Sequence, residues 1–199
     1  MKAFSNLLSD LILTSSRNRK LSLLEQYFSS TPDPDRGYAL AALTGSLNFK
    51  NIKASFFKNL IKEKQDEHLF DLSYDYVGDL AETISLLWDQ EKGGNMPRLS
   101  SLFENLKKAK NDELKNHIIN ILNISTADQR WAFIKLFTGG LRIGVSSRLV
   151  KQALANYGNV DLDEIEKIWH GLHFPYFNLF SWLENLSLIH ISEPTRQDR

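Results

Sequence analysis

The 199-residue chain contains no cysteine, so neither disulfide bonds nor cysteine-ligated metal can hold its fold, and its redox compartment stays open. It has no excess charge, because 24 Lys and Arg balance 24 Asp and Glu. This balance excludes a uniformly basic nucleic-acid binder but not a locally basic face. No apolar run approaches the roughly 20 residues that cross a bilayer, and the first residues lack the apolar stretch and cleavage site of a signal peptide. We therefore expect a soluble cytoplasmic protein without membrane contact.

Alternating β-branched runs are also nearly absent, whereas apolar residues repeat three and four positions apart along most of the chain. This spacing is typical of helices with one buried stripe, as at Phe4, Leu7, Leu8 and Leu11. We predict an all-α fold of about ten helices in one compact domain, residues 1–185. The spacing of Val77, Leu80, Ile84 and Leu87 predicts a single helix that closes at Gly93-Gly94.

The last segment, residues 186–199, departs from this helical pattern. Its sequence Leu-Ser-Leu-Ile-His-Ile-Ser-Glu-Pro-Thr-Arg resembles the translation of a transposon-type sequencing adapter. We interpret it as a non-native tail, and we expect the natural protein to continue with a different sequence. A genuine C-terminal tail with a short apolar patch is the alternative.

Charge is segregated along the chain although the total is zero. Residues 130–152 carry five basic residues and no acidic one, while residues 65–91 carry eight acidic residues and no basic one. A second basic cluster lies near Lys50 and Lys53. The acidic residues Asp75, Asp79 and Glu82 have the spacing of one helix face, which we interpret as solvated rather than as an acid–base pair.

A glycine-rich bend, residues 138–144, interrupts the acid-free stretch between two helical patterns. Glycine permits positive φ and lets the backbone approach a ligand closely, and Ser146 has the position of a helix N-cap. The first turn of a helix offers unpaired N–H groups and a positive dipole end to a phosphate oxygen. The segment therefore predicts a phosphate-binding bend, although an ordinary helix–turn–helix corner has the same pattern. The expected contact residues are Lys135, Thr138, Gly139, Gly140, Arg142, Gly144, Ser146, Arg148 and Lys151, with Lys50 and Lys53 from the second cluster.

Three segments in order resemble the N-terminal DNA-binding domain of ATP-dependent DNA ligases. The first is Gly78-Asp79-Leu80-Ala81-Glu82, and the second runs from Arg130 through Gly-Gly-Leu-Arg-Ile-Gly to Ser146. The third runs from Glu166 to Leu172, followed by Pro175-Tyr176, and resembles the end of this domain in the bacterial branch. The resemblance spans residues 1–185. The family often has lysine or another polar residue where Gly140 stands, so Gly140 offers a phosphate only its backbone.

The resemblance implies a specific function. A domain of this family grips nicked double-stranded DNA through sugars and phosphates without reading sequence, in replication, repair or recombination. Separate nucleotidyltransferase and OB-fold domains of the same chain then seal the nick with ATP and Mg²⁺. The 199 residues contain no Lys-x-Asp-Gly motif; Lys64-Gln65-Asp66-Glu67 lacks its glycine. We thus expect no catalytic residue, no cofactor site and no sealing by this fragment alone.

Two further possibilities remain open. His170 and His173 have no nearby third ligand in sequence, so we interpret them as packed or surface residues and expect no metal site. The basic face could instead bind an acidic protein, which would make the chain a helical interaction scaffold. We expect the chain to be a monomer. If it is a ligase module, we expect it in the cytoplasm near the nucleoid.

Overall fold

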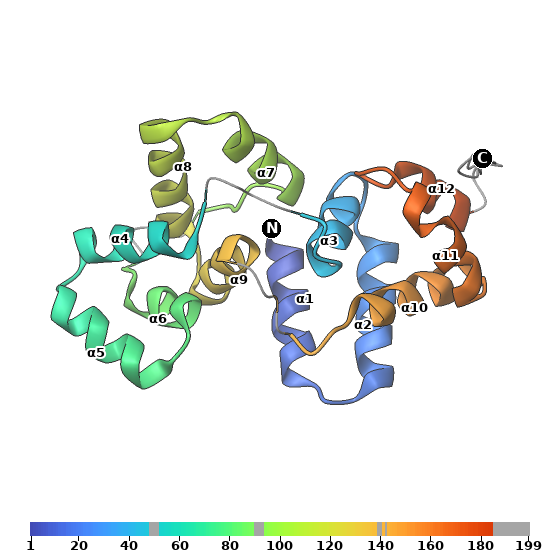
Figure 1. Cartoon of the computed structure of the whole chain (residues 1–199), viewed down its shortest axis with the longest axis horizontal. Coiled ribbons are helices and arrows are strands. Elements are labelled where there is room, and N and C mark those ends of the chain that lie inside the picture. Colours follow the sequence, from blue (N-terminus) through green and yellow to red (C-terminus); the bar gives the residue numbers. More distant parts are fainter. Residues whose placement is uncertain (48–51, 90–93, 139–140, 142, 185–199) are drawn as a thin grey trace, which may run out of the picture. The chain divides into compact units, whose positions relative to one another are not determined.

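The computed structural model describes residues 1–47, 52–89, 94–138, 141 and 143–184. Within these ranges every regular element is helical, which confirms the all-α prediction (Figure 1). The contacts group the chain into two compact units: unit 1 contains residues 1–9 and 48–142, and unit 2 contains residues 10–47 and 143 onward. Whether the two units act as the single domain 1–185 stays a prediction.

Unit 1 is built around helix α9. It contains the start of α1 (Lys2–Leu13) and α4 (Ala54–Lys64), α5 (Glu67–Val77), α6 (Leu80–Leu87), α7 (Leu99–Lys108), α8 (Asn111–Ile124) and α9 (Ala127–Thr138). Helix α9 packs against α6 and α4. Phe133 and Phe137 of α9 contact each other, with ring centroids 5.0 Å apart, and contact Phe57 of α4 at 6.3 and 6.5 Å. These aromatic contacts and the buried apolar stripes supply the core of this unit.

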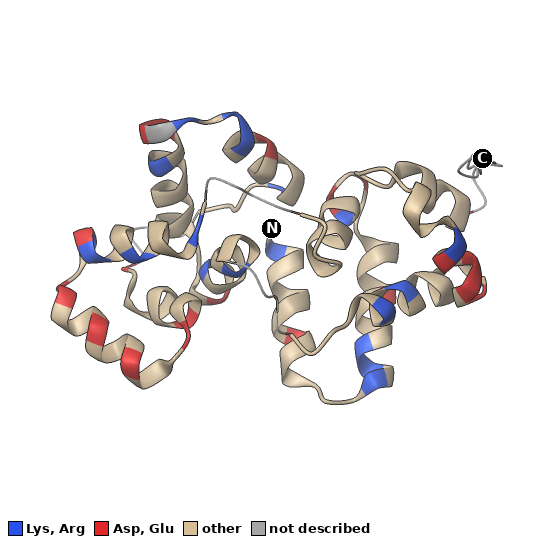
Figure 2. Ribbon diagram, in the orientation of Figure 1, with Lys and Arg blue, Asp and Glu red and all other residues tan. Residues whose placement is uncertain are grey.

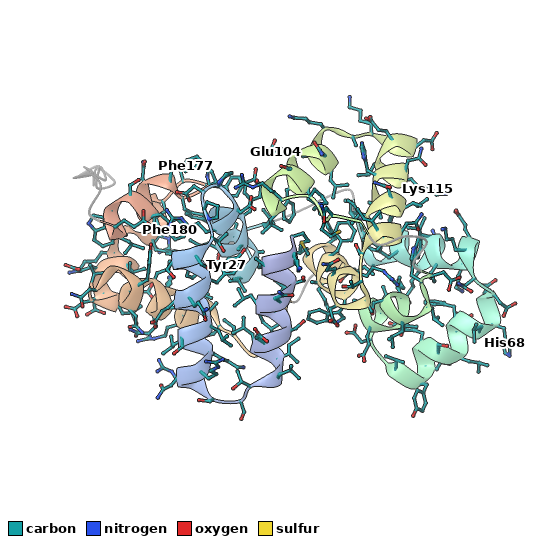
Figure 3. All side chains as sticks on the ribbon, turned by 180° about the vertical axis from the view of Figure 1, so that it is seen from behind. Tyr27, His68, Glu104, Lys115, Phe177 and Phe180 are labelled. Atoms are coloured by element: carbon teal, nitrogen blue, oxygen red, sulfur yellow. The ribbon has the colours of Figure 1, made fainter. Side chains whose placement is uncertain are left out.

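Unit 2 is built around helix α10. Its elements are α2 (Arg17–Ser30), α3 (Asp35–Leu43), α10 (Ser147–Gly158), α11 (Leu162–Ile168), the 3₁₀ turn η1 (Trp169–Gly171) and α12 (Phe177–Leu183). Helix α10 packs against α2, α3, α11 and α12. Phe180 of α12, labelled in Figure 3, is fully buried and its ring lies 5.8 Å from that of Phe28 in α2. The acid-free stretch of the sequence thus supplies the central helix of each unit.

The predicted helix through Val77 and Leu87 is wrong, because Gly78 divides it. Val77 ends α5, Gly78 takes the left-handed conformation with φ 74°, and Asp79 caps α6 by accepting from the N–H of Glu82 at 3.0 Å. Glycine adopts this conformation without the Cβ penalty of other residues. The predicted single acidic face is wrong for the same reason, because Asp75 lies on α5 and Glu82 on α6.

Arg130 of α9 has a structural role that its sequence position did not reveal. Its side chain is buried, 3% exposed, and donates to the carbonyl oxygens of Ser85 and Ser125, at 2.8 Å and 3.0–3.1 Å, and to that of Trp88. Burial lowers the pKa of this guanidinium from its ordinary value. These carbonyl groups lie at the end of α6 and directly before α9. The Arg130 side chain therefore supplies hydrogen-bond donors to backbone carbonyls at both places.

Arg36 has the corresponding role in unit 2. It is buried, 7% exposed, and forms a salt bridge to Asp33 at 2.8 Å and another to Glu184. Tyr157 donates to the same Glu184 carboxylate at 2.5 Å, so α3, α10 and the end of α12 meet at one network. The hydrogen bond from Arg36 and that from Tyr157 outweigh burial and hold the pKa of Glu184 below its usual range.

Within the described residues, no helix combines the length and apolarity required to cross a bilayer.

Replacing Arg130 with Met should destabilise unit 1 by about 3 kcal/mol, because three buried carbonyl groups lose a charged donor while the volume is nearly kept. Urea denaturation followed by circular dichroism measures the free energy of unfolding. Arg148→Met is the matched control, since Arg148 is exposed, and it should change stability by less than about 0.5 kcal/mol. Equal losses in both variants would contradict the structural role of Arg130.

Unit 2 should lose stability when the pH falls from about 5 to about 3, where an unperturbed glutamate protonates. The sign follows from the lowered pKa of Glu184: the unfolded chain binds the proton first, so acid favours unfolding. Glu184→Gln should lower stability at neutral pH and flatten this acid limb, as measured by thermal unfolding across pH. Glu164→Gln is the control, because Glu164 is exposed in the same unit; an identical acid limb in wild type and Glu184→Gln would refute the assignment.

Candidate nucleic-acid interface

The glycine-rich bend lies where the chain passes from unit 1 into unit 2. Thr138 ends α9, and its hydroxyl donates to the carbonyl oxygen of Ile134 at 3.0 Å. Gly139, Gly140 and Arg142, three of the expected contact residues, lie outside the described residues. Gly144 is exposed and has φ 64°, the left-handed conformation that its residue type permits.

The start of α10 has the expected capped geometry. Ser146 precedes the helix and its hydroxyl accepts from the N–H of Leu149 at 3.2 Å, which confirms the predicted N-cap. Arg148 projects from the first turn and is exposed, and among the described residues it has no ion-pair partner. Within the same described part of the chain, the N–H groups of Ser147 and Arg148 donate to no backbone acceptor. Unpaired N–H groups, a positive dipole end and a free guanidinium together suit an anionic oxygen.

Lys20 of α2 contacts the end of the glycine-rich bend, and the sequence analysis did not predict this contact. Its ammonium donates to the carbonyl oxygen of Gly144 at 2.9 Å and to that of Ile143 at 3.4 Å. Because Lys20 is 124 positions from Gly144 in sequence, no local pattern could associate the two. The contact attaches the start of α2 to the residues just before α10.

The first turn of α2 carries two further basic residues, Arg17 and Arg19, on the helix that contacts Gly144 through Lys20. Arg17 and Arg19 are exposed, and among the described residues neither has an ion-pair partner. Ser16 caps α2 by accepting from the N–H of Arg19 at 3.3 Å. Figure 2 shows basic residues, coloured blue on the ribbon, at the start of α2 and along α10, two helices that pack against each other. We call the exposed cations Arg17, Arg19 and Arg148, with Lys20 and the Gly144 bend, the α2–α10 basic surface.

Lys151 is committed to a contact within unit 2. Its ammonium lies 2.5 Å from a carboxylate oxygen of Glu166 and 4.5 Å from the centre of the Trp169 ring, and its side chain is only 12% exposed. These contacts join α10 to α11 and to η1. A phosphate could bind Lys151 only in competition with Glu166.

Lys135 is similarly paired within unit 1. Its ammonium forms a salt bridge with Asp79 and lies 6.0 Å from the Trp131 ring centre. Burial would raise the pKa of Asp79, but the hydrogen bonds from Lys135 and from the N–H of Glu82 together outweigh it and lower that pKa. Lys53 precedes α4 and is exposed, without an ion-pair partner among the described residues. Lys50 lies outside the described residues.

The expected contact residues are therefore divided between the units. Gly144, Ser146 and Arg148 come together at the start of α10 in unit 2, whereas Lys135, Thr138 and Lys53 belong to unit 1. Convergence of the two groups on one surface stays a prediction. Among the described residues, no group of three histidine or carboxylate side chains is arranged to hold a metal ion.

A sequence model of the family described as DNA ligase N terminus matches residues 1–155 of the 199. The matched range contains the glycine-rich bend and most of α10. A search of curated proteins found no match.

Replacing Gly144 with Ala should cost about 1 kcal/mol of stability for the left-handed backbone. It should also displace Lys20, because the new Cβ would lie 2.5 Å from its ammonium. Gly45→Ala is the matched control in the same unit, since Gly45 has φ 75° but nothing within 4 Å of the place that an added Cβ would take. Urea denaturation of both variants gives the two free energies of unfolding.

Adding Lys20→Met to each variant separates the backbone from the contact. With Gly45→Ala it should cost about 0.5 to 1 kcal/mol more, the contribution of one hydrogen bond, whereas with Gly144→Ala it should cost almost nothing. If Lys20→Met were equally costly in both backgrounds, Lys20 would not be acting on the Gly144 bend.

Proposed function

This chain belongs to the DNA ligase N-terminus family, and we propose that it binds nicked double-stranded DNA through the sugar-phosphate backbone. It does so as the N-terminal module of an ATP-dependent DNA ligase. The observation that carries the proposal is the α2–α10 basic surface. There a capped helix start and three guanidinium groups, unpaired among the described residues, accompany the exposed Gly144.

This surface has the chemistry of phosphate recognition. Backbone N–H groups at the start of α10 and guanidinium groups such as that of Arg148 contact phosphate oxygens equally well beside any base. Contacts to phosphate fix the position of the duplex and carry no sequence information of their own. The module therefore positions an enzyme on DNA without selecting a sequence, which suits a ligase that must act at any nick.

The ion pairs divide the basic residues into two classes of contact. Arg17, Arg19 and Arg148 are available without breaking a bond, and they form the centre of the proposed surface. Lys135 and Lys151 contribute only if phosphate displaces Asp79 or Glu166. They therefore have a secondary role, while Arg142, in the bend itself, retains the central role that the sequence gave it.

The ligation chemistry belongs to the rest of the proposed enzyme. Nucleotidyltransferase and OB-fold domains of the same chain would use ATP and Mg²⁺ to activate the 5′-phosphate at the nick, and the present module would hold the duplex for them. The proposed setting is DNA replication, repair or recombination in the cytoplasm of the cell, at the nucleoid.

Arg148→Ala, and the pair Arg17→Ala with Arg19→Ala, should each weaken binding to a nicked duplex by roughly tenfold at 50 mM salt. Each lost phosphate contact should also lower the slope of log affinity against log salt by about 1. Arg142→Ala should behave like Arg148→Ala, and Lys135→Ala should have a smaller effect. Fluorescence anisotropy with a labelled duplex at several salt concentrations measures both quantities.

Lys115→Ala is the control, because Lys115, labelled in Figure 3, is paired with Glu63 on α4, away from the bend in sequence. Its affinity should equal that of wild type. Binding that ignores salt concentration, or that Lys115→Ala weakens as much as Arg148→Ala, would reject the proposal. Failure to bind DNA together with specific binding of an acidic protein would favour the interaction-scaffold alternative.

A further inference from the structure

Helix α5 exposes an apolar face that no other described part of unit 1 covers. Leu69 is 47% exposed, Leu72 is 56% exposed and Tyr76 is 93% exposed. Their spacing of three and four residues puts all three on one side of the helix. The opposite side of α5 packs into the core of unit 1, because Phe70 is buried there and α5 packs against α4 and α6.

Three large side chains, Leu69, Leu72 and Tyr76, are exposed together on this one side of α5. Helices of soluble proteins normally direct such side chains to the core, and a contiguous apolar patch on a surface commonly marks a binding site. Tyrosine is among the residues that contribute most to protein interfaces, and Tyr76 is nearly fully accessible. The fold does not require these three side chains on the outside, since Phe70 with the neighbouring helices anchors α5.

Acidic residues border this stripe. On the helix, Asp75 lies one turn after Leu72, and Asp71 lies one turn before Asp75. The exposed His68, labelled in Figure 3, lies one turn before Leu72. Lys62 of α4 pairs with Asp71 at 3.2 Å and with Glu67 at 2.6 Å. Asp75 has no cationic partner among the described residues. Figure 2 shows acidic residues, coloured red on the ribbon, along α5, whose sequence contains no Lys or Arg.

We propose that Leu69, Leu72, Tyr76 and Asp75, the α5 face, bind a basic amphipathic helix of a partner protein. The apolar side chains require an apolar stripe opposite them, with residues at i, i+3, i+4 and i+7. The uncompensated carboxylate of Asp75, beside Asp71, requires Lys or Arg at the border of that stripe. The same negative charge repels phosphate, so this surface is distinct from the α2–α10 basic surface and the inference does not depend on DNA binding.

The test uses the full chain and a defined probe, a fluorescein-labelled 14-residue helical peptide of leucine and lysine with leucine at i, i+3, i+4 and i+7. A matched peptide carries glutamate in place of every lysine. We expect the lysine peptide to bind in fluorescence anisotropy and the glutamate peptide to bind at least tenfold more weakly. Rising salt concentration should weaken the lysine peptide, because part of its affinity is electrostatic.

Leu72→Ser combined with Tyr76→Ser should weaken the lysine peptide at least tenfold, and Asp75→Asn should weaken it by a few fold. All three side chains are exposed, so the helical circular dichroism spectrum should not change. Leu13→Ser is the matched control: Leu13 is 84% exposed on α1, outside the α5 face, and its loss should leave affinity unchanged.

Three results would overturn the proposal. The two peptides could bind equally, or the Leu72→Ser, Tyr76→Ser chain could bind the lysine peptide as tightly as wild type. Sedimentation could also show a dimer of the wild-type chain that this double variant abolishes, in which case the α5 face binds a second copy. Arginine variants of the α2–α10 basic surface that lose DNA binding should keep the peptide affinity and the sedimentation behaviour of wild type.

Discussion

A cation that is withdrawn from water must find an oxygen partner, and this constraint organises the basic residues of the protein. Arg130 and Arg36 are almost fully buried, and each satisfies its guanidinium group with backbone carbonyls or carboxylates. Lys135 and Lys151 are partly buried and each has one carboxylate partner. Among the described residues, three arginines that stay exposed without an ion-pair partner, Arg17, Arg19 and Arg148, lie at the start of α2 and of α10.

The division of the cations into paired and unpaired ones changes how the charge pattern of the sequence is interpreted. The acid-free stretch and the acidic stretch are separate in sequence, yet Lys135 of the first pairs with Asp79 of the second. Part of the segregation therefore stabilises contacts between helices within one unit. The charge that stays exposed includes two surfaces of opposite sign, the α2–α10 basic surface and the α5 face, and these suit two different kinds of partner.

Local features of the sequence predicted local structure well. Thr126 and Gln129 form reciprocal capping contacts before α9, at 3.4 Å from the N–H of Gln129 and 3.1 Å from the N–H of Thr126. Ser146 caps α10 as expected. The failure at Gly78 has a physical reason: an apolar repeat continues across a left-handed glycine, so the periodicity of Val77 and Leu80 conceals the break between α5 and α6.

The sequence alone determined that the protein is helical and to which family it belongs, because periodicity and motif order involve neighbouring residues. It also located the exposed start of α10. Only the tertiary structure decided which cations are available, since the partners of Lys135 and Arg36 lie 56 and 148 positions away. It likewise joined Lys20 to the Gly144 bend. Those pairings depend on how helices pack, and packing brings together side chains whose separation in sequence carries no signal of their contact.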